Sequence, residues 1–93
     1  MTNAEKMFKN LGYHIEKREY ENELEHYSKM EDLIGEVAYK DIVFDLKTKD
    51  IYLISESRFT DEWVEKHRKV NFNLTINELR TINEKCKELG WLR

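Results

Sequence analysis

The sequence has no proline and only three glycines, so it lacks the residues that usually form linkers and low-complexity segments. Its single cysteine, Cys86, excludes an internal disulfide bond, and the fold must therefore be stabilised by packing alone. No apolar run reaches the length that a membrane-spanning helix needs, and the amphipathic N-terminal residues do not resemble a signal peptide. These absences predict one soluble intracellular domain over residues 1–93.

Charge is abundant in this chain and unevenly distributed. Charged residues make up 38% of the sequence, against about a quarter in most proteins, and the net charge is −3. An acidic belt in the first third has Lys29 as its only lysine or arginine and consists of Glu19, Glu21, Glu23, Glu25, Glu31, Asp32 and Glu36. The one basic run, Lys66–Lys69, is too short in a chain of pI 5.6 to form the basic surface that nucleic-acid binding requires, so direct binding to nucleic acid is not expected.

Both ends of the chain carry the signals of a helix. Thr2 and Thr75 are each followed three residues later by a glutamate, which is the pattern of a capping box. Gly12 and Gly90 each follow the last apolar residue at helical spacing, where a left-handed cap needs no Cβ. The sequence therefore predicts helices over about residues 3–11 and 76–89, with buried stripes formed by Met7, Phe8 and Leu11 and by Ile76, Leu79, Ile82, Cys86 and Leu89.

The clearest strand signal lies between residues 41 and 54. Apolar residues alternate with other residues over 41–46, a polar turn follows, and a second apolar run covers 51–54. Both sets of apolar residues are expected on the buried face of a hairpin, facing the two helical stripes. The predicted register, with a two-residue turn at Thr48 and Lys49, pairs Leu46 with Ile51 and Phe44 with Leu53 and places Ile42 on the same face.

Other stretches leave alternatives open. Residues 13–18 alternate weakly and follow a glycine, which favours a strand. Residues 19–29 fit a strand pair that turns at Glu21 and Asn22, or a helix that ends at Gly35, and residue propensity favours the helix. Residues 57–73 fit a short helix capped near Thr60, or an extended segment that ends as a strand at 72–74.

A weak catalytic pattern occurs in the predicted hairpin. Asp45, Leu46 and Lys47 at a strand end, with Asp41 or Asp32 upstream, are similar to metal-dependent nucleases, where two carboxylates hold Mg²⁺ and a lysine polarises the attacking water. A solvent-facing strand residue and a turn residue explain the same pattern without any chemistry. The three histidines and Cys86 show no metal-ligand spacing, so no metal and no cofactor are expected, and Cys86 is interpreted as a core residue.

The first four acids of the belt, from Glu19 to Glu25, occupy alternate positions. In an extended strand such residues project to one side about 7 Å apart, a spacing comparable to that of phosphates along a nucleic-acid strand. The belt can then compete for a basic nucleic-acid channel, although a solvated face that keeps the protein soluble is the commoner role. The predicted partner-binding residues are Glu19, Glu21, Glu23, Glu25, Glu31, Asp32 and Trp63.

Three segments carry a resemblance to a known group. They are T-N-A-E-K-M-F-K-N-L-G-Y at residues 2–13, I-V-F-D-L-K at 42–47, and L-T-I-N-E-L-R-T-I-N-E-K at 74–85, followed by E-L-G-W-L at 88–92. By these motifs the chain resembles a group of small proteins of phages and prophages of Firmicutes that have no established activity. The resemblance implies strands over 13–20 and 23–29 ahead of the central hairpin, and a location in the host cytoplasm, but it implies no functional residues.

Together these patterns predict an α+β fold with an N-terminal helix, an antiparallel meander of about four strands, and a C-terminal helix packed on one sheet face. The expected function is that of a non-catalytic phage accessory protein that binds a host protein; its sharpest form is an acidic inhibitor of a host defence nuclease with a basic channel. The alternatives are a homodimeric structural domain and a small metal-dependent nuclease or nucleic-acid-processing enzyme that uses Asp41, Asp45 and Lys47. No membrane partner is expected.

Overall fold

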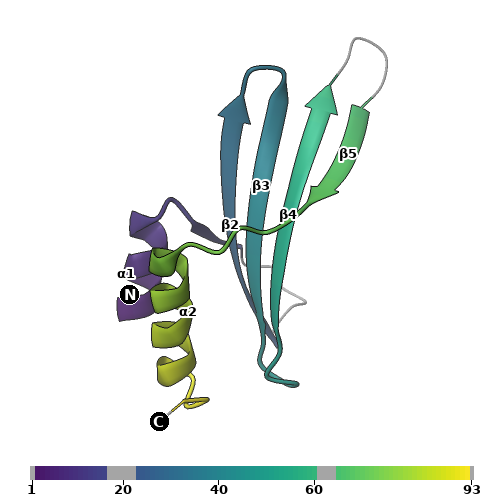
Figure 1. Ribbon diagram of the computed structural model, residues 1–93. Helices are drawn as coiled ribbons and strands as arrows, with labels where there is room; N and C mark the ends of the chain where they lie inside the picture. Colours follow the sequence, from purple (N-terminus) through teal and green to yellow (C-terminus); the bar gives the residue numbers. More distant parts are fainter. Residues whose placement is uncertain (1, 17–22, 61–64, 93) are drawn as a thin grey trace. The chain divides into compact units, whose positions relative to one another are not determined.

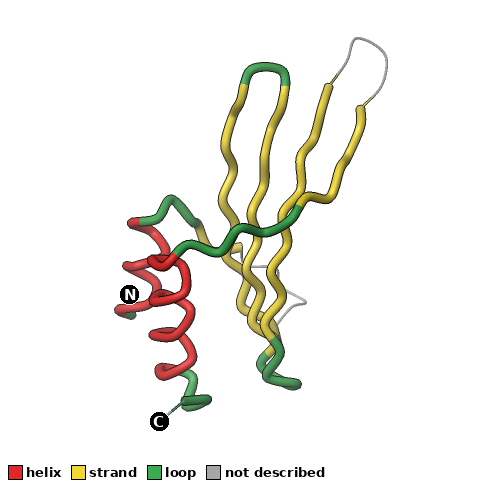
Figure 2. Tube along the Cα trace, in the orientation of Figure 1, coloured by secondary structure: helices red, strands yellow, loops and turns green. Residues whose placement is uncertain are grey.

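The computed structural model describes residues 2–16, 23–60 and 65–92 (Figure 1). All strands belong to one sheet in the order β1-β2-β3-β4-β5, so each strand lies beside its neighbour in sequence (Figure 2). The predicted α+β fold of helix, antiparallel meander and helix is confirmed, with five strands instead of about four. In chain order the elements are α1 (Asn3–Asn10), β1 (His14–Glu16), β2 (Leu24–Leu33), β3 (Glu36–Asp45), β4 (Ile51–Thr60), β5 (Glu65–Val70) and α2 (Ile76–Glu88).

The chain divides into two compact units. The helical unit comprises Met1–His14 and Asn73–Arg93, and the sheet unit comprises Ile15–Phe72. Each unit has its own buried residues, described below. The expectations that the whole chain forms one domain, and that the C-terminal helix covers one face of the sheet, stay predictions.

The helix ends confirm the predicted caps. At α2 the Thr75 hydroxyl accepts the N–H of Glu78 at 3.1 Å, and Glu78 Oε1 accepts the N–H of Thr75 at 2.9 Å, which completes the capping box. At α1 the Thr2 hydroxyl accepts the N–H of Glu5 at 3.2 Å. The two glycines that follow the helices have the left-handed conformation, with φ of 91° at Gly12 and 77° at Gly90.

The buried face of α2 differs from the predicted apolar stripe. Ile76 and Leu79 are 64% and 49% exposed, so their predicted burial is wrong, whereas Ile82 and Cys86 are buried as predicted. Glu78, Thr81 and Lys85 complete the buried face. Hydrogen bonds satisfy the buried side-chain oxygens of two of these polar residues. The Thr81 hydroxyl donates to the carbonyl of Asn77 at 2.7 Å, and Glu78 accepts a hydrogen bond from the Tyr13 hydroxyl.

The β3–β4 hairpin has a different register from the predicted one. Phe44 pairs with Ile51, and Ile42 pairs with Leu53, a shift of two residues that leaves every side chain on its predicted face. The loop is longer than two residues because the Asp45 side chain organises it. Asp45 Oδ1 accepts the N–H groups of Lys47 at 3.0 Å and Thr48 at 3.1 Å, and Lys49 takes a positive φ of 61°.

Both ambiguous stretches contain strands. Residues 24–33 form β2, which confirms the strand expected over 23–29 and excludes the helix ending at Gly35. Ile34 and Gly35 connect β2 to β3, with a φ of 75° at Gly35. The predicted turn at Glu21 and Asn22 lies outside the described residues. Farther on, residues 65–70 form β5, which supports the extended alternative and excludes a helix at these residues, whereas residues 72–74 form no strand.

One face of the sheet, the closed face, holds the core of the sheet unit. Tyr27, Ile42 and Phe44 are at most 1% exposed, and the Tyr27 and Phe44 rings meet edge to face at 5.9 Å between centroids. Leu53 lies on this face beside Ile42 but is 40% exposed, so its predicted burial is wrong. The reason is that β5 pairs with β4 only from Ser55 to Thr60 and leaves the outer side of Leu53 uncovered.

Candidate interaction surface

The acidic belt is only partly a row of solvated carboxylates. Alternate residues of a strand share a face, so Glu25, Tyr27, Lys29 and Glu31 follow one another on the closed face of β2. Tyr27 is buried, and its hydroxyl donates to Glu25 Oε2 at 3.3 Å. Buried Tyr27 and half-buried Lys29 therefore separate Glu25 from Glu31 within the acidic belt. Glu19, Glu21 and Trp63, three of the predicted binding residues, lie outside the described residues.

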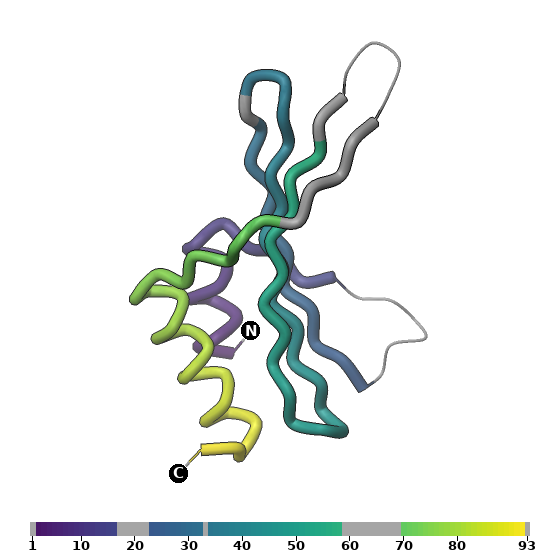
Figure 3. The backbone as a smooth tube through the Cα atoms, turned by 45° about the vertical axis from the view of Figure 1, so that its right-hand side comes forward, coloured from purple at the N-terminus to yellow at the C-terminus, as the bar shows by residue number. Residues whose placement is uncertain are grey.

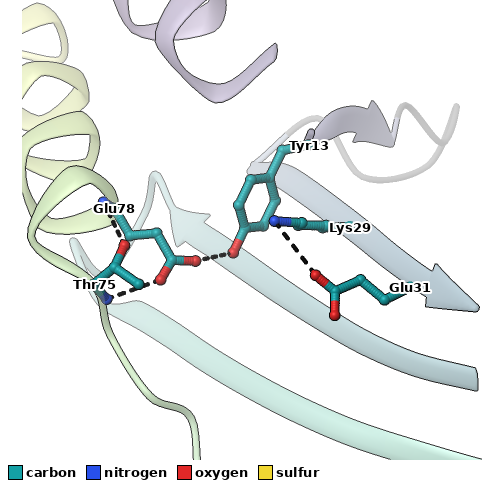
Figure 4. Close-up of polar contacts among 5 residues, drawn as sticks. All are labelled: Tyr13, Lys29, Glu31, Thr75 and Glu78. Atoms are coloured by element: carbon teal, nitrogen blue, oxygen red, sulfur yellow. Dashed lines mark hydrogen bonds and ion pairs between the residues drawn. The ribbon is translucent and has the colours of Figure 1, made fainter. Parts of the chain in front are cut away.

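Lys29 forms an ion pair within the belt. Its Nζ lies 3.8 Å from Glu31 Oε1, and the side chains are 28% and 60% exposed (Figure 4). A pair this open to water gains little free energy because solvent screens the attraction, so most of the Glu31 charge remains available to another molecule. Asp32, the next residue, is also exposed.

The turn between β2 and β3 places these carboxylates beside an apolar residue in full contact with water. Ile34 is fully exposed, although β-branched residues are unusual in turns, where Gly, Asn, Asp, Pro and Ser supply the required geometry. Met30 is 53% exposed on the opposite face of β2 from Glu31. We define the hairpin tip as Met30, Glu31, Asp32, Ile34 and Glu36.

The other face of the sheet, the open face, carries charges that are already partnered. His26 Nε2 lies 2.7 Å from Asp41 Oδ1, across β2 and β3, with side chains 19% and 20% exposed. The Arg58 guanidinium lies 5.3 Å from the centroid of the Tyr39 ring. The sequence analysis missed the His26–Asp41 pair, because residues so far apart in sequence are brought together only by the strand register. The pair links β2 to β3, and His26 on this face therefore already has a partner.

The residues of the alternative nuclease site do not converge. Asp41 is engaged by His26, and Asp45 lies four residues farther along β3, about 13 Å away in an extended strand. One Mg²⁺ ion, with ligands at roughly 2 Å, cannot bridge that distance. Asp45 is also occupied by its own loop, where the N–H of Thr48, together with that of Lys47, lowers the pKa of the Asp45 carboxyl. Across the described ranges, no group of three or more His, Cys, Asp or Glu residues is placed to hold a metal ion.

The helical unit contains a polar cluster with a structural role. Glu78 is 4% exposed and joins the N-terminal cap of α2 to Tyr13, which is itself buried (Figure 4). Cys86 is buried on the same helix, and burial raises the pKa of its thiol, so little reactive thiolate forms. The interpretation of Cys86 as a core residue is confirmed by its burial.

Comparisons of the chain with protein-family models, with curated proteins and with solved structures find no match. The resemblance to phage proteins therefore stays a prediction. In the part of the chain that the structure describes, no helix combines the length and the apolar character that crossing a membrane requires.

Proposed function

We propose that this protein is a non-catalytic phage or prophage accessory protein that binds a host protein through the hairpin tip. In its sharpest form, the proposal makes it an acidic inhibitor that occupies the basic channel of a host defence nuclease. The observation that supports binding is the combination of a fully exposed Ile34 with the exposed carboxylates of Glu31 and Asp32.

The two kinds of side chain have separate tasks in such a complex. Carboxylates steer the protein toward a basic surface and speed association, but exposed charges alone add little affinity. Burial of an isoleucine side chain against a partner contributes about 1.5–3 kcal/mol. A belt that only maintained solubility would not require an isoleucine in the turn between β2 and β3.

Capture from a host lysate tests the proposal with three variants of the full chain. We expect the wild-type chain to retain a basic host protein that is released as salt rises, and Asp32→Lys and Ile34→Ser to lose it. Asp50→Lys is the matched control, because it makes the same charge change at the opposite end of β3, about 30 Å from the tip along an extended strand. Retention by both tip variants at the wild-type level would overturn the proposal.

If a nuclease is captured, its cleavage of DNA or RNA with and without the purified chain tests the sharpest form. We expect wild-type protein and Asp50→Lys to inhibit cleavage, and Asp32→Lys to restore it. Cleavage by this protein itself, lost in Asp45→Ala, would instead favour the nuclease alternative.

A further inference from the structure

The lower part of β4 has an open edge. In the described part of the sheet, β5 pairs with β4 only from Ser55 to Thr60, so residues 51–54 have a neighbour on the β3 side alone. The chain leaves the edge at this point because it crosses the closed face after β5. There the ring of Phe72 lies 4.4 Å from Lys40 Nζ.

The backbone of this segment points unpaired groups outward. Asp45 donates its N–H to the carbonyl of Asp50 at 2.9 Å, which identifies these two as a hydrogen-bonded pair of the β3–β4 ladder. Such pairs alternate with non-bonded pairs in an antiparallel ladder. The N–H and C=O groups of Tyr52 and Ile54 therefore face β3, whereas those of Ile51 and Leu53 face the open edge.

The side chains of the segment are apolar and accessible. Tyr52, Leu53 and Ile54 are 47%, 40% and 40% exposed, and no charged residue occurs between Asp50 and Glu56. Proteins usually protect an edge with charged residues, especially lysine. Residues 51–54 contain no charged residue and therefore lack such protection.

We propose that this open edge binds a second copy of the chain, so that the two β4 strands pair antiparallel about a two-fold axis between their Tyr52 residues. In this register Ile51 of each copy exchanges both backbone hydrogen bonds with Leu53 of the other, which satisfies the outward groups of both. The two Tyr52 side chains then lie directly opposite each other as a non-bonded pair.

A second copy fits this edge better than a charged partner does. The segment is uncharged, so it selects neither a basic nor an acidic protein, and two copies meet without like-charge repulsion. Its alternation of outward groups at Ile51 and Leu53 is symmetric about Tyr52 and therefore complements itself. The edge lies near the β3–β4 loop, at the other end of β3 from the hairpin tip, so the pairing stands independently of the proposed host binding.

Sedimentation equilibrium of the full chain tests the pairing. We expect the wild-type chain to sediment as a dimer, Tyr52→Lys and Tyr52→Glu each to sediment as monomers, and an equimolar mixture of the two variants to recover a dimer. The mixture is expected to dimerise because the lysine at position 52 of one chain then lies directly opposite the glutamate at position 52 of the other. Ile34→Lys, which introduces a lysine at the exposed tip instead, serves as the matched control and should remain dimeric.

Leu53→Pro provides a second variant, because it removes an outward N–H without removing a hydrogen bond to β3. We expect it to be monomeric with a retained cooperative thermal melt. A dimer that persists in Leu53→Pro and in both charged variants would overturn the proposal. A monomeric wild-type chain would also overturn the proposed pairing, and would favour binding of an extended segment of another protein at this edge.

Discussion

Asp45 is the residue that determines the β3–β4 loop. Its Oδ1 accepts two backbone N–H groups and so organises a loop that the alternating apolar pattern did not predict. The sequence showed the two strands correctly, but the pattern of apolar residues repeats every two positions, and a register shifted by two satisfies it equally well. The side-chain bonds of Asp45, the positive φ of Lys49 and the backbone hydrogen bond from Asp45 to Asp50 distinguish the two registers.

The lowered pKa of Asp45 predicts how stability depends on pH. The N–H of Thr48 is its main cause, and the pKa lies below the ordinary value of the unfolded chain. The ionised carboxylate therefore stabilises the fold above that ordinary value, and the contribution disappears as the pH falls through the lowered pKa. Thermal melts between about pH 2 and pH 6 should show a weaker pH dependence in Asp45→Asn than in wild type. Identical pH dependence would exclude this contribution.

Substitutions at Gly90 measure the free-energy cost of a left-handed backbone conformation, because an added Cβ meets no nearby atom there. Its φ is 77°, and a Cβ built there would meet no atom within 4 Å. Gly90→Ala should therefore lower the free energy of unfolding by about 1 kcal/mol through backbone strain alone, and Gly90→Val by more. Chemical denaturation measures both changes. An unchanged midpoint in Gly90→Val would show that the left-handed cap does not form.

At the scale of whole elements, the two helices were the most predictable part of the chain. Each is bounded by a threonine and a glycine whose effects depend on neighbouring residues only, and the structure confirms both. The buried face of α2 was less predictable, because the burial of Glu78 depends on Tyr13, which is distant in sequence. Strand β2 was ambiguous for the same reason, since pairing with β3 overrides its helical propensity.

The cap of α2 yields a graded prediction. Thr75→Ala removes one hydrogen bond and should lower the free energy of unfolding by about 1 kcal/mol. Glu78→Ala removes the reciprocal bond and also an acceptor of the buried Tyr13 hydroxyl. This variant should therefore lower the free energy of unfolding by about 2–3 kcal/mol. Glu78→Gln keeps an acceptor oxygen and should fall between the two. Equal losses in Thr75→Ala and Glu78→Ala would show that the Tyr13 bond adds nothing.

The candidate surface was predicted in part. The sequence showed the carboxylates of the belt and Lys29 among them, but it did not show that Tyr27 is buried or that Ile34 lies in a hairpin turn. Ile34 was missed because isoleucine is not a turn residue. The available signal was Gly35, because glycine readily adopts the positive φ that a short hairpin turn requires.

At the scale of the whole molecule, two surfaces at opposite ends of β3 have different chemistry (Figure 3). The hairpin tip combines carboxylates with one exposed isoleucine, whereas the lower edge of β4 is uncharged and offers backbone groups. A charged partner suits the first surface and a second copy of the chain suits the second. Variants at one surface should therefore leave the function of the other unchanged.

The most direct test of the central claim, binding through the hairpin tip, is the rate of association with the purified captured partner as salt is varied. The account predicts that wild-type association slows as salt rises, that Asp32→Lys slows association and flattens this dependence, and that Ile34→Ser mainly speeds dissociation. Wild-type association and dissociation rates in both variants, with an unaltered salt dependence, would contradict the account.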